Sequence, residues 1–364
     1  MIDPHLNPNT LTMIQDFSNA FGPSGFEDGT IAVARHYADG LGTIEEDCLR
    51  NLYIHASGNT GDRPIFMLDA HSDEIGFMVH SIKPNGTLRF VALGGWNTSS
   101  LPSSKVLVRN KYGELLPGII AAKPVHFLTA ADKEKGGSPA IQDLVIDVGA
   151  TSAEEASEYF GIRIGEPVIP DVVFQYDEKR DILMGKAFDC RIGCAALIET
   201  MRRLSKENLN VDVVGVLSSQ EEVGERGARV AVNHVKPQIA LCFEGCPADD
   251  TFTETYAIQT ALKKGPMLRF MDRSIICSPR YQRFALDLAE EQQIPVQTSV
   301  REGGGNNGAM INTSIDGIPV IVAGVPVRYI HSHHGITSGY DFEATVQLAC
   351  AVVKAMSEQV IQSF

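Results

Sequence analysis

Residues 220–224 (Gln-Glu-Glu-Val-Gly) place two adjacent carboxylates, Glu221 and Glu222, directly after a run of apolar residues. Carboxylates this close repel each other, and a bare acidic pair is usually solvated surface. A divalent cation changes that balance, because its charge offsets the repulsion. One carboxylate can then bind the ion while its neighbour moves a proton. The pair therefore raises the hypothesis of metal-assisted hydrolysis.

A histidine and a carboxylate, His71 and Asp73, follow a second apolar run. A metal-binding imidazole commonly donates its other N–H to a carboxylate, which fixes the tautomer. The same pair is also common on protein surfaces, where the histidine serves no ion. Asp189, in the segment 185–193 that leads into a predicted helix, is open to two interpretations as well. It could bind a metal, or it could cap that helix.

Two further positions complete a candidate set of donors. Glu244 lies in the segment 242–245 (Cys-Phe-Glu-Gly), and His331 begins a cluster that also holds His333 and His334. Histidine clusters bind metals in some proteins and arise by chance in others. Two imidazoles and three carboxylates, with Glu221 to spare, are enough to hold two divalent ions bridged by one carboxylate, with a water between them. The five candidate ligands are His71, Asp189, Glu222, Glu244 and one histidine of the cluster at 331–334.

Four continuous apolar runs precede these residues, at 65–68, 211–217, 239–243 and 318–323. Runs without polar alternation are typical of strands that helices cover on both faces. In open α/β sheets, ligands bind beyond the carboxyl ends of the strands. We therefore expect one site at a sheet edge, built from distant positions of the chain.

Helices between these runs are indicated by apolar residues that recur at i, i+3, i+4 and i+7. Such faces pack on a sheet, and their Met and Cys residues are expected to fill the core. The two clearest stripes are Cys194, Leu197, Ile198 and Met201, and then Val346, Ala349, Cys350 and Val353.

The segment 75–170 has a different sequence pattern. It consists of short stretches in which apolar and polar residues alternate, broken by turn residues such as 84–86 (Pro-Asn-Gly). Strand–helix alternation flanks it on both sides. We therefore predict an α/β catalytic domain of residues 1–74 and 171–364, with a mostly parallel sheet covered by helices on both faces. A small β-barrel-like domain is inserted at 75–170. Within it, the segment 132–137 is predicted to be a surface loop.

Charge and composition exclude several classes of protein. The 364 residues include 31 Lys plus Arg and 45 Asp plus Glu, a formal charge of −14 that repels polyanions and argues against nucleic-acid binding. No apolar run reaches the length of a membrane span. Residues 1–9 lack the basic and apolar regions of a secretory signal. The seven cysteines are predicted to be reduced and mostly buried, so we expect a cytoplasmic protein.

Four segments, in order, resemble the tetrahedral-aminopeptidase family, which includes glutamyl aminopeptidases and proteins once labelled cellulase M or endoglucanase. The resemblance runs from about Phe21 to His331 and so covers most of the chain. The segments that carry it are 70–76 (Ala-His-Ser-Asp-Glu-Ile-Gly), 188–193 (Phe-Asp-Cys-Arg-Ile-Gly), 220–228 (Gln-Glu-Glu-Val-Gly-Glu-Arg-Gly-Ala) and 328–332 (Arg-Tyr-Ile-His-Ser).

The resemblance implies a zinc-peptidase-like fold and an aminopeptidase with two divalent ions per subunit, zinc or cobalt. By analogy with the family, Asp189 would bridge the two ions. His71 and Glu244 would hold one ion, and Glu222 and His331 would hold the other.

The same resemblance implies the remaining roles. Glu221 would be the general base, and Asp73 would orient the histidine two residues before it. The substrates would be small peptides. The inserted β domain would mediate assembly into a homo-oligomer, in many members a dodecameric tetrahedron.

Three positions depart from the family's usual pattern. Glu244 stands where Asp is more common, Cys190 replaces an Asn, and Asn307 lies in a glycine-rich segment, 303–308, where the family commonly has Thr-Asp. Other functions stay open, and the departures at Glu244 and Asn307 prompt the last of them. The alternatives are another metal-dependent amidohydrolase or deacylase, a glycosidase as in the older family labels, and a catalytically silent shell-forming homologue.

Overall fold

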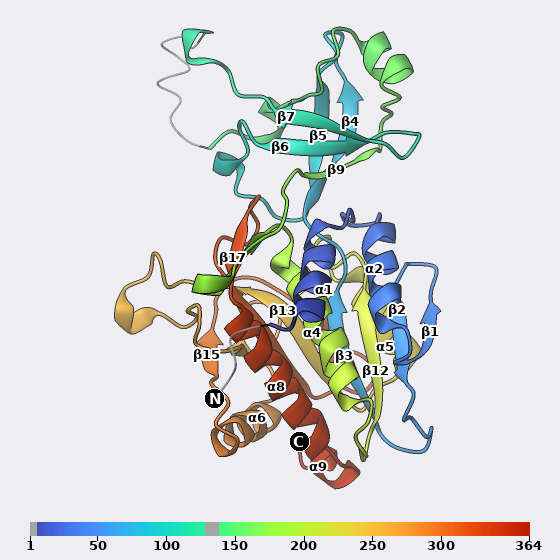
Figure 1. The fold of residues 1–364 in the computed structure, drawn as a ribbon, viewed down its shortest axis with the longest axis vertical. Helices are drawn as coiled ribbons and strands as arrows, with labels where there is room; N and C mark the ends of the chain where they lie inside the picture. The colour runs from blue at the N-terminus through green and yellow to red at the C-terminus, as the bar shows by residue number, and fades with distance from the viewer. Residues whose placement is uncertain (1–5, 128–137) are drawn as a thin grey trace. The chain divides into compact units, whose positions relative to one another are not determined.

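The computed structural model describes residues 6–127 and 138–364. The chain divides into two units (Figure 1). The first comprises the residues up to Glu74 together with Phe174–Ile330 and His334–Phe364, and the second comprises Ile75–Val173 with His331–His333. The surface loop predicted at 132–137 lies outside the described residues.

The first unit is built on an eight-stranded sheet whose four central strands are parallel. Antiparallel pairing occurs toward both edges, where β1 pairs with β2, β2 with β12, and β14 with β16. The predicted apolar runs are confirmed as the four central strands. In sheet order the strands are β1 (Gly42–Glu46), β2 (Leu52–Ala56), β12 (Asp212–Ser218), β3 (Ile65–His71), β13 (Ile239–Pro247), β16 (Val320–Val327), β14 (Met267–Met271) and β15 (Gln297–Val300).

Helices cover both faces of this sheet, because successive residues of each central strand point to opposite faces and both faces are apolar. In β16, Ile321 and Ala323 pack into one core cluster, and Val320 and Val322 pack into the other. The first cluster includes α4 and α8, which cross the sheet in Figure 1. Its helices are α1 (Pro8–Asn19), α2 (Asp28–Ala38), α4 (Phe188–Leu204), α6 (Pro279–Glu291) and α8 (Gly339–Ala355), whereas α5 (Arg226–Val235) and α7 (Asn307–Asn312) belong to the second.

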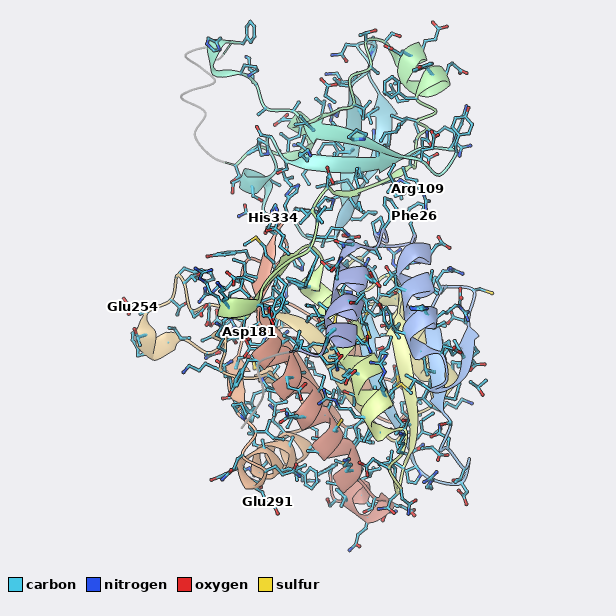
Figure 2. All side chains as sticks on the ribbon, in the orientation of Figure 1. Phe26, Arg109, Asp181, Glu254, Glu291 and His334 are labelled. Atoms are coloured by element: carbon cyan, nitrogen blue, oxygen red, sulfur yellow. The ribbon has the colours of Figure 1, made fainter. Side chains whose placement is uncertain are left out.

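Both predicted helical stripes are confirmed, since they lie buried in α4 and α8. The short helix α9 (Glu358–Gln362) follows α8 and packs residues against the same cluster. A small antiparallel sheet joins β10 (Gln175–Asp177), β11 (Ile182–Gly185) and β17 (Gly335–Thr337). The loop 248–266 between β13 and β14 carries Glu254 (Figure 2).

The second unit contains a closed six-stranded barrel, which confirms the predicted β-barrel-like insertion. Its interior is filled by alternating apolar residues such as Phe77, Val79, Val106 and Val108. Gly86, in the turn predicted at 84–86, has a φ of 84°, a conformation that glycine adopts without steric cost. Around the barrel the strands are β4 (Gly76–Ile82), β5 (Leu88–Leu93), β8 (Ile146–Asp147), β7 (Leu115–Ile120), β6 (Lys105–Arg109) and β9 (Pro167–Pro170).

The burial of the cysteines agrees with the prediction. All seven cysteines are free thiols, and all but Cys48 are buried. Within the two described ranges, the helices are too short or too polar to cross a bilayer.

Candidate functional site

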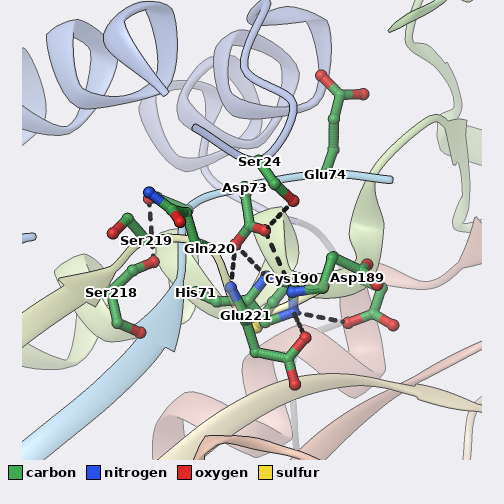
Figure 3. A network of polar contacts seen from close by, with 12 residues as sticks. Ser24, His71, Asp73, Glu74, Asp189, Cys190, Ser218, Ser219, Gln220 and Glu221 are labelled. Atoms are coloured by element: carbon green, nitrogen blue, oxygen red, sulfur yellow. Dashed lines mark hydrogen bonds and ion pairs between the residues drawn. The ribbon is translucent and has the colours of Figure 1, made fainter. Parts of the chain in front are cut away.

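The carboxyl ends of the central strands bring distant polar residues of the first unit together. His71 is the last residue of β3, and its register partner in β12 is Ser218, which directly precedes the turn that carries Glu221. The Nε2 atom of His71 lies 3.1 Å from an Asp189 carboxylate oxygen and 3.9 Å from one of Glu221 (Figure 3). It also lies 3.8 Å from a carboxylate oxygen of Glu244. The predicted site at one sheet edge therefore exists as a geometric cluster.

Two overlapping groups in this cluster have donor atoms within 4.8 Å of one another. One group is His71, Asp189, Cys190 and Glu244, and the other is His71, Glu221 and Glu222. Four of the five predicted ligands thus share one site, together with the predicted base.

The fifth predicted ligand, His331, belongs to the second unit. There its Nδ1 lies 2.8 Å from the carbonyl oxygen of Gly95. Its role as a ligand stays a prediction.

Asp189 is placed by an irregular start to α4. The backbone is non-helical at Asp189 and Cys190, the second and third residues of α4. A Cβ atom at Gly245 would lie 2.4 Å from the carbonyl oxygen of Phe188, so only glycine lets β13 approach this segment closely. Gly245 thereby allows Glu244 and Asp189 to share a site.

Asp73 holds the turn that carries the acidic pair. Its Oδ1 accepts the backbone N–H of Glu221 at 3.0 Å and lies 3.3 Å from Nδ1 of His71. Its Oδ2 accepts the N–H of Glu222 at 3.2 Å and the hydroxyl of Ser24 at 2.6 Å. One buried carboxylate therefore fixes both the imidazole and the two glutamates.

Glu27 extends this support by one residue. Its Oε1 accepts the backbone N–H of Gln220 at 3.1 Å and that of Gly25 at 2.8 Å. Together with Asp73, it binds three consecutive amides of the turn, at 220, 221 and 222. The turn is thus held by carboxylates from segments far away in the sequence.

The electrostatics of the cluster favour a cation. Burial raises the pKa of Glu244 well above its usual value, and the negative charges of Asp189 and Glu221 raise it further. Burial also raises the pKa of Glu221. Burial by itself would lower the pKa of His71, but the surrounding negative groups, chiefly Glu221, raise it well above its ordinary value. Buried carboxylates gathered in this way require compensating positive charge, and imidazole and carboxylate are donors that zinc and cobalt accept. The residues fit a metal centre.

A buried ion cluster lies behind the site. Lys186 Nζ donates to both carboxylate oxygens of Glu74, at 2.7 and 2.8 Å, and to the carbonyl of Ala20. Arg191 donates to the carbonyls of Phe17 and Gly22. These cations satisfy carbonyls at and just beyond the carboxyl end of α1, which have no partner within the helix. They thereby join α1 to the segment that follows β3.

Asn307 is a buried bridge. Its amide donates to an Asp69 carboxylate oxygen at 2.8 Å and to the hydroxyl of Ser218 at 2.7 Å. A carboxylate at position 307 would face Asp69 and repel it, whereas the amide donates a hydrogen bond to it. This departure from the family pattern is therefore matched to its neighbour in β3.

Four supporting residues were not predicted: Ser24, Glu27, Lys186 and Arg191. The sequence position of each residue gave an indication of its role. Ser24 and Glu27 belong to the turn-forming segment 22–27 (Gly-Pro-Ser-Gly-Phe-Glu), and Lys186 and Arg191 flank Asp189.

Comparison with known proteins adds four results. A family model described as M42 glutamyl aminopeptidase matches residues 51–348. The glutamyl aminopeptidase of Lactococcus lactis is 32% identical over 315 residues, which cover 86% of this chain and 87% of that protein.

Two solved structures have the same architecture. A TET aminopeptidase from a marine sediment archaeon of the Thaumarchaeota is 35% identical with a TM-score of 0.92, and the match covers 98% of this chain and 99% of that one. The TET1 peptidase of Pyrococcus horikoshii, which can assemble into a tetrahedron or a large octahedral shell, is 29% identical with a TM-score of 0.85. That match covers 95% of this chain and 100% of the other.

Proposed function

The chain belongs to the M42 glutamyl aminopeptidase family, and from this premise we propose that it is a dinuclear metallo-aminopeptidase that removes N-terminal residues from small peptides. The observation that carries the proposal is the convergence of His71, Asp189 and Glu244 with the acidic pair at the strand ends. The family assignment supports the reaction class, and the gathering of buried carboxylates supports the need for cations.

The proposed ligands follow the predicted assignment. Asp189 would be shared between two divalent ions, zinc or cobalt. His71 and Glu244 would hold one ion, and Glu222 and His331 would hold the other. When bound, such ions lower the pKa of a water molecule and polarise the scissile carbonyl.

Glu221 is the proposed proton carrier. It takes a proton from the attacking water and returns it to the departing amine. Burial raises its pKa, which moves the group toward the range in which a carboxylate both accepts and releases a proton near neutral pH. Asp73 acts through its neighbours, because it orients His71 and holds the backbone of Glu221.

The test of this proposal is Glu221→Ala, assayed on a panel of aminoacyl-arylamides with elemental analysis of the same sample. Loss of a general base costs about 10²- to 10⁴-fold in rate, so activity should fall by that factor while the metal content stays unchanged. Glu254→Ala, on the loop 248–266, is the control and should keep full activity. Near-normal turnover by Glu221→Ala rejects the role of the base.

A chelator separates the proposed reaction from its rivals. Removal of the ions should abolish hydrolysis, whereas a glycosidase that relies on two carboxylic acids would keep its activity. Failure of the wild-type chain to bind any divalent ion would instead support the catalytically silent homologue.

The proposal extends to the setting of the enzyme. The inserted domain mediates assembly of a homo-oligomer. A dodecameric tetrahedron is the proposed form, and the tetrahedron of the Pyrococcus horikoshii peptidase supports it. The net charge of −14 and the free cysteines support a cytoplasmic protein with neither nucleic-acid nor membrane partners.

A further inference from the structure

A second convergence of metal-binding side chains lies at the β1 edge of the eight-stranded sheet. Glu45 on β1, His55 on β2 and His234 on α5 form a group whose donor atoms are within 4.8 Å of one another. The Nε2 atom of His55 is 2.8 Å from Oε1 of Glu45, and the Nε2 atom of His234 is 2.7 Å from the same oxygen. Two imidazoles from different elements thus point at one carboxylate atom.

Regular secondary structure fixes these three positions. In the antiparallel register Glu45 pairs with Tyr53, and His55 pairs with Thr43. Side chains alternate along a strand, so Glu45 and His55 project from the same face of the hairpin. The ring of His234 lies 4.4 Å from that of Tyr53, centroid to centroid. Tyr53 is buried, and its hydroxyl donates to Asp47, so it provides a fixed surface for the histidine.

The spacing is close to that of a metal site. A tetrahedral zinc ion with bonds of about 2.0–2.1 Å separates its donor atoms by about 3.3 Å. The two nitrogen–oxygen distances here are 2.8 and 2.7 Å, so the side chains need to open by only about half an ångström to admit an ion at these bond lengths. The side chains of Glu45, His55 and His234 are 45%, 34% and 46% exposed, so an ion can reach them and keep water in its remaining positions.

The charge of the group also suits a cation. Glu45 offers one carboxylate oxygen to which both ring nitrogens are close. Two imidazoles and one carboxylate are a donor set that favours borderline divalent ions over magnesium or calcium, which prefer oxygen ligands.

We propose that Glu45, His55 and His234 form an additional metal site for Zn²⁺ or a similar borderline divalent ion, separate from the cluster around His71. The bound ion joins the β1–β2 hairpin at the sheet edge to the last turn of α5. This inference does not depend on the proposed peptidase mechanism.

The test is equilibrium dialysis of the full chain against Zn²⁺ alone, followed by elemental analysis of the wild type, His55→Ala and His234→Ala. The wild type should retain one zinc ion per chain more than either variant. His36→Ala is the matched control, because His36 is an exposed histidine that belongs to none of the metal-capable groups in the described part of the chain. It should retain as much zinc as the wild type. Equal zinc content in the wild type and His234→Ala overturns the proposal.

A second measurement addresses the link between the elements. Zn²⁺ should raise the thermal unfolding midpoint of the wild type by more than that of His234→Ala, because only the wild type can join the hairpin to α5. Identical shifts contradict the proposal. The wild type and all variants share the cluster around His71. A difference between them therefore tests only the site of Glu45, His55 and His234, whatever the cluster around His71 binds.

Discussion

Glu27 combines deep burial with an incomplete set of hydrogen bonds. Its Oε2 has no hydrogen-bond partner among the described residues, and the charge of Asp73 is nearby. Burial, with a further contribution from Asp73, raises the pKa of Glu27 from 4.5 to about 7. The folded protein therefore holds this proton more tightly than the unfolded chain. The resulting stability is fully present below pH 4.5 and is lost as the pH rises through about 7.

Substitution of Glu27 by Gln tests this assignment. The amide keeps an acceptor for the N–H groups of Gly25 and Gln220 but cannot titrate. Between pH 4.5 and 7 the wild type should lose about 3 kcal/mol more of its free energy of unfolding than Glu27→Gln, as measured by urea unfolding. Glu254→Gln should follow the wild-type curve. Parallel curves for the wild type and Glu27→Gln would show that the residue does not titrate in this way.

The histidine cluster offers a second comparison between single residues. If His331 binds an ion as proposed, His331→Ala should lower the metal content per chain. His333, which lies 5.4 Å from the ring of Trp96, is assigned no metal, so His333→Ala should leave the content unchanged. Elemental analysis of the purified variants distinguishes the two residues. Equal metal content in both would remove His331 from the ligand set.

At the scale of elements, the buried ions behind the site join three segments. Lys186 precedes α4, Glu74 follows β3, and the carbonyls that Lys186 and Arg191 bind belong to the end of α1 and the residues after it. Burial lowers the pKa of Lys186 to about 8 in spite of the Glu74 carboxylate beside it. The segment that carries His71 and Asp73 is therefore anchored through Glu74 to helices on the same face of the sheet.

Removal of Lys186 should show how strongly a buried Glu74 carboxylate destabilises the fold when its nearest cation is gone. Lys186→Met leaves the Glu74 carboxylate with Arg191, at 3.4 Å, as its remaining cation. We expect a loss of about 3–5 kcal/mol in the free energy of unfolding, because removal of one partner of a buried ion pair is strongly destabilising. The double variant Lys186→Met/Glu74→Met should recover part of this loss. Urea unfolding of both proteins checks the expectation, and a double variant less stable than the single one would contradict it.

The central elements could be predicted from the sequence because each has a local signal. The runs at 65–68 and 239–243 are apolar without interruption, and the stripe from Cys194 to Met201 has helical spacing. The acids and histidines at the ends of these runs could be found for the same reason. Antiparallel pairing at the sheet edges carries no comparable signal, because a short half-exposed strand such as β1 can pair in either direction.

The supporting contacts of the site could not be predicted in the same way. Ser24 meets Asp73 across 49 residues of chain, and Glu27 meets Gln220 across 193. Their positions depend on how the elements pack, and a serine or a glutamate in a turn is consistent with many other roles. The sequence contains these residues but no local pattern that names their partners.

At the scale of the whole molecule, the barrel unit exposes large apolar side chains that assembly could cover. Ile119, Tyr159 and Ile164 are 49%, 82% and 72% exposed in the single chain. If the inserted domain mediates assembly, Ile164→Glu should reduce the oligomer to smaller species in size-exclusion chromatography with light scattering, because a charge would be buried without a partner. Val230→Glu, which alters an exposed apolar residue of α5 in the first unit, is the control. Unchanged assembly in Ile164→Glu would place the interface elsewhere.

The residues of the cluster around His71 lie far apart in the sequence, and this separation also bears on how the enzyme is made. A nascent chain must be synthesised past Glu244 before β3, β12 and β13 can align, so no fragment released earlier holds the complete donor group around His71. If the cluster binds ions as proposed, we expect them to be acquired after these strands have aligned. Chelated protein should keep its circular dichroism spectrum and recover activity when zinc or cobalt is added back, which makes maturation a reversible loading step.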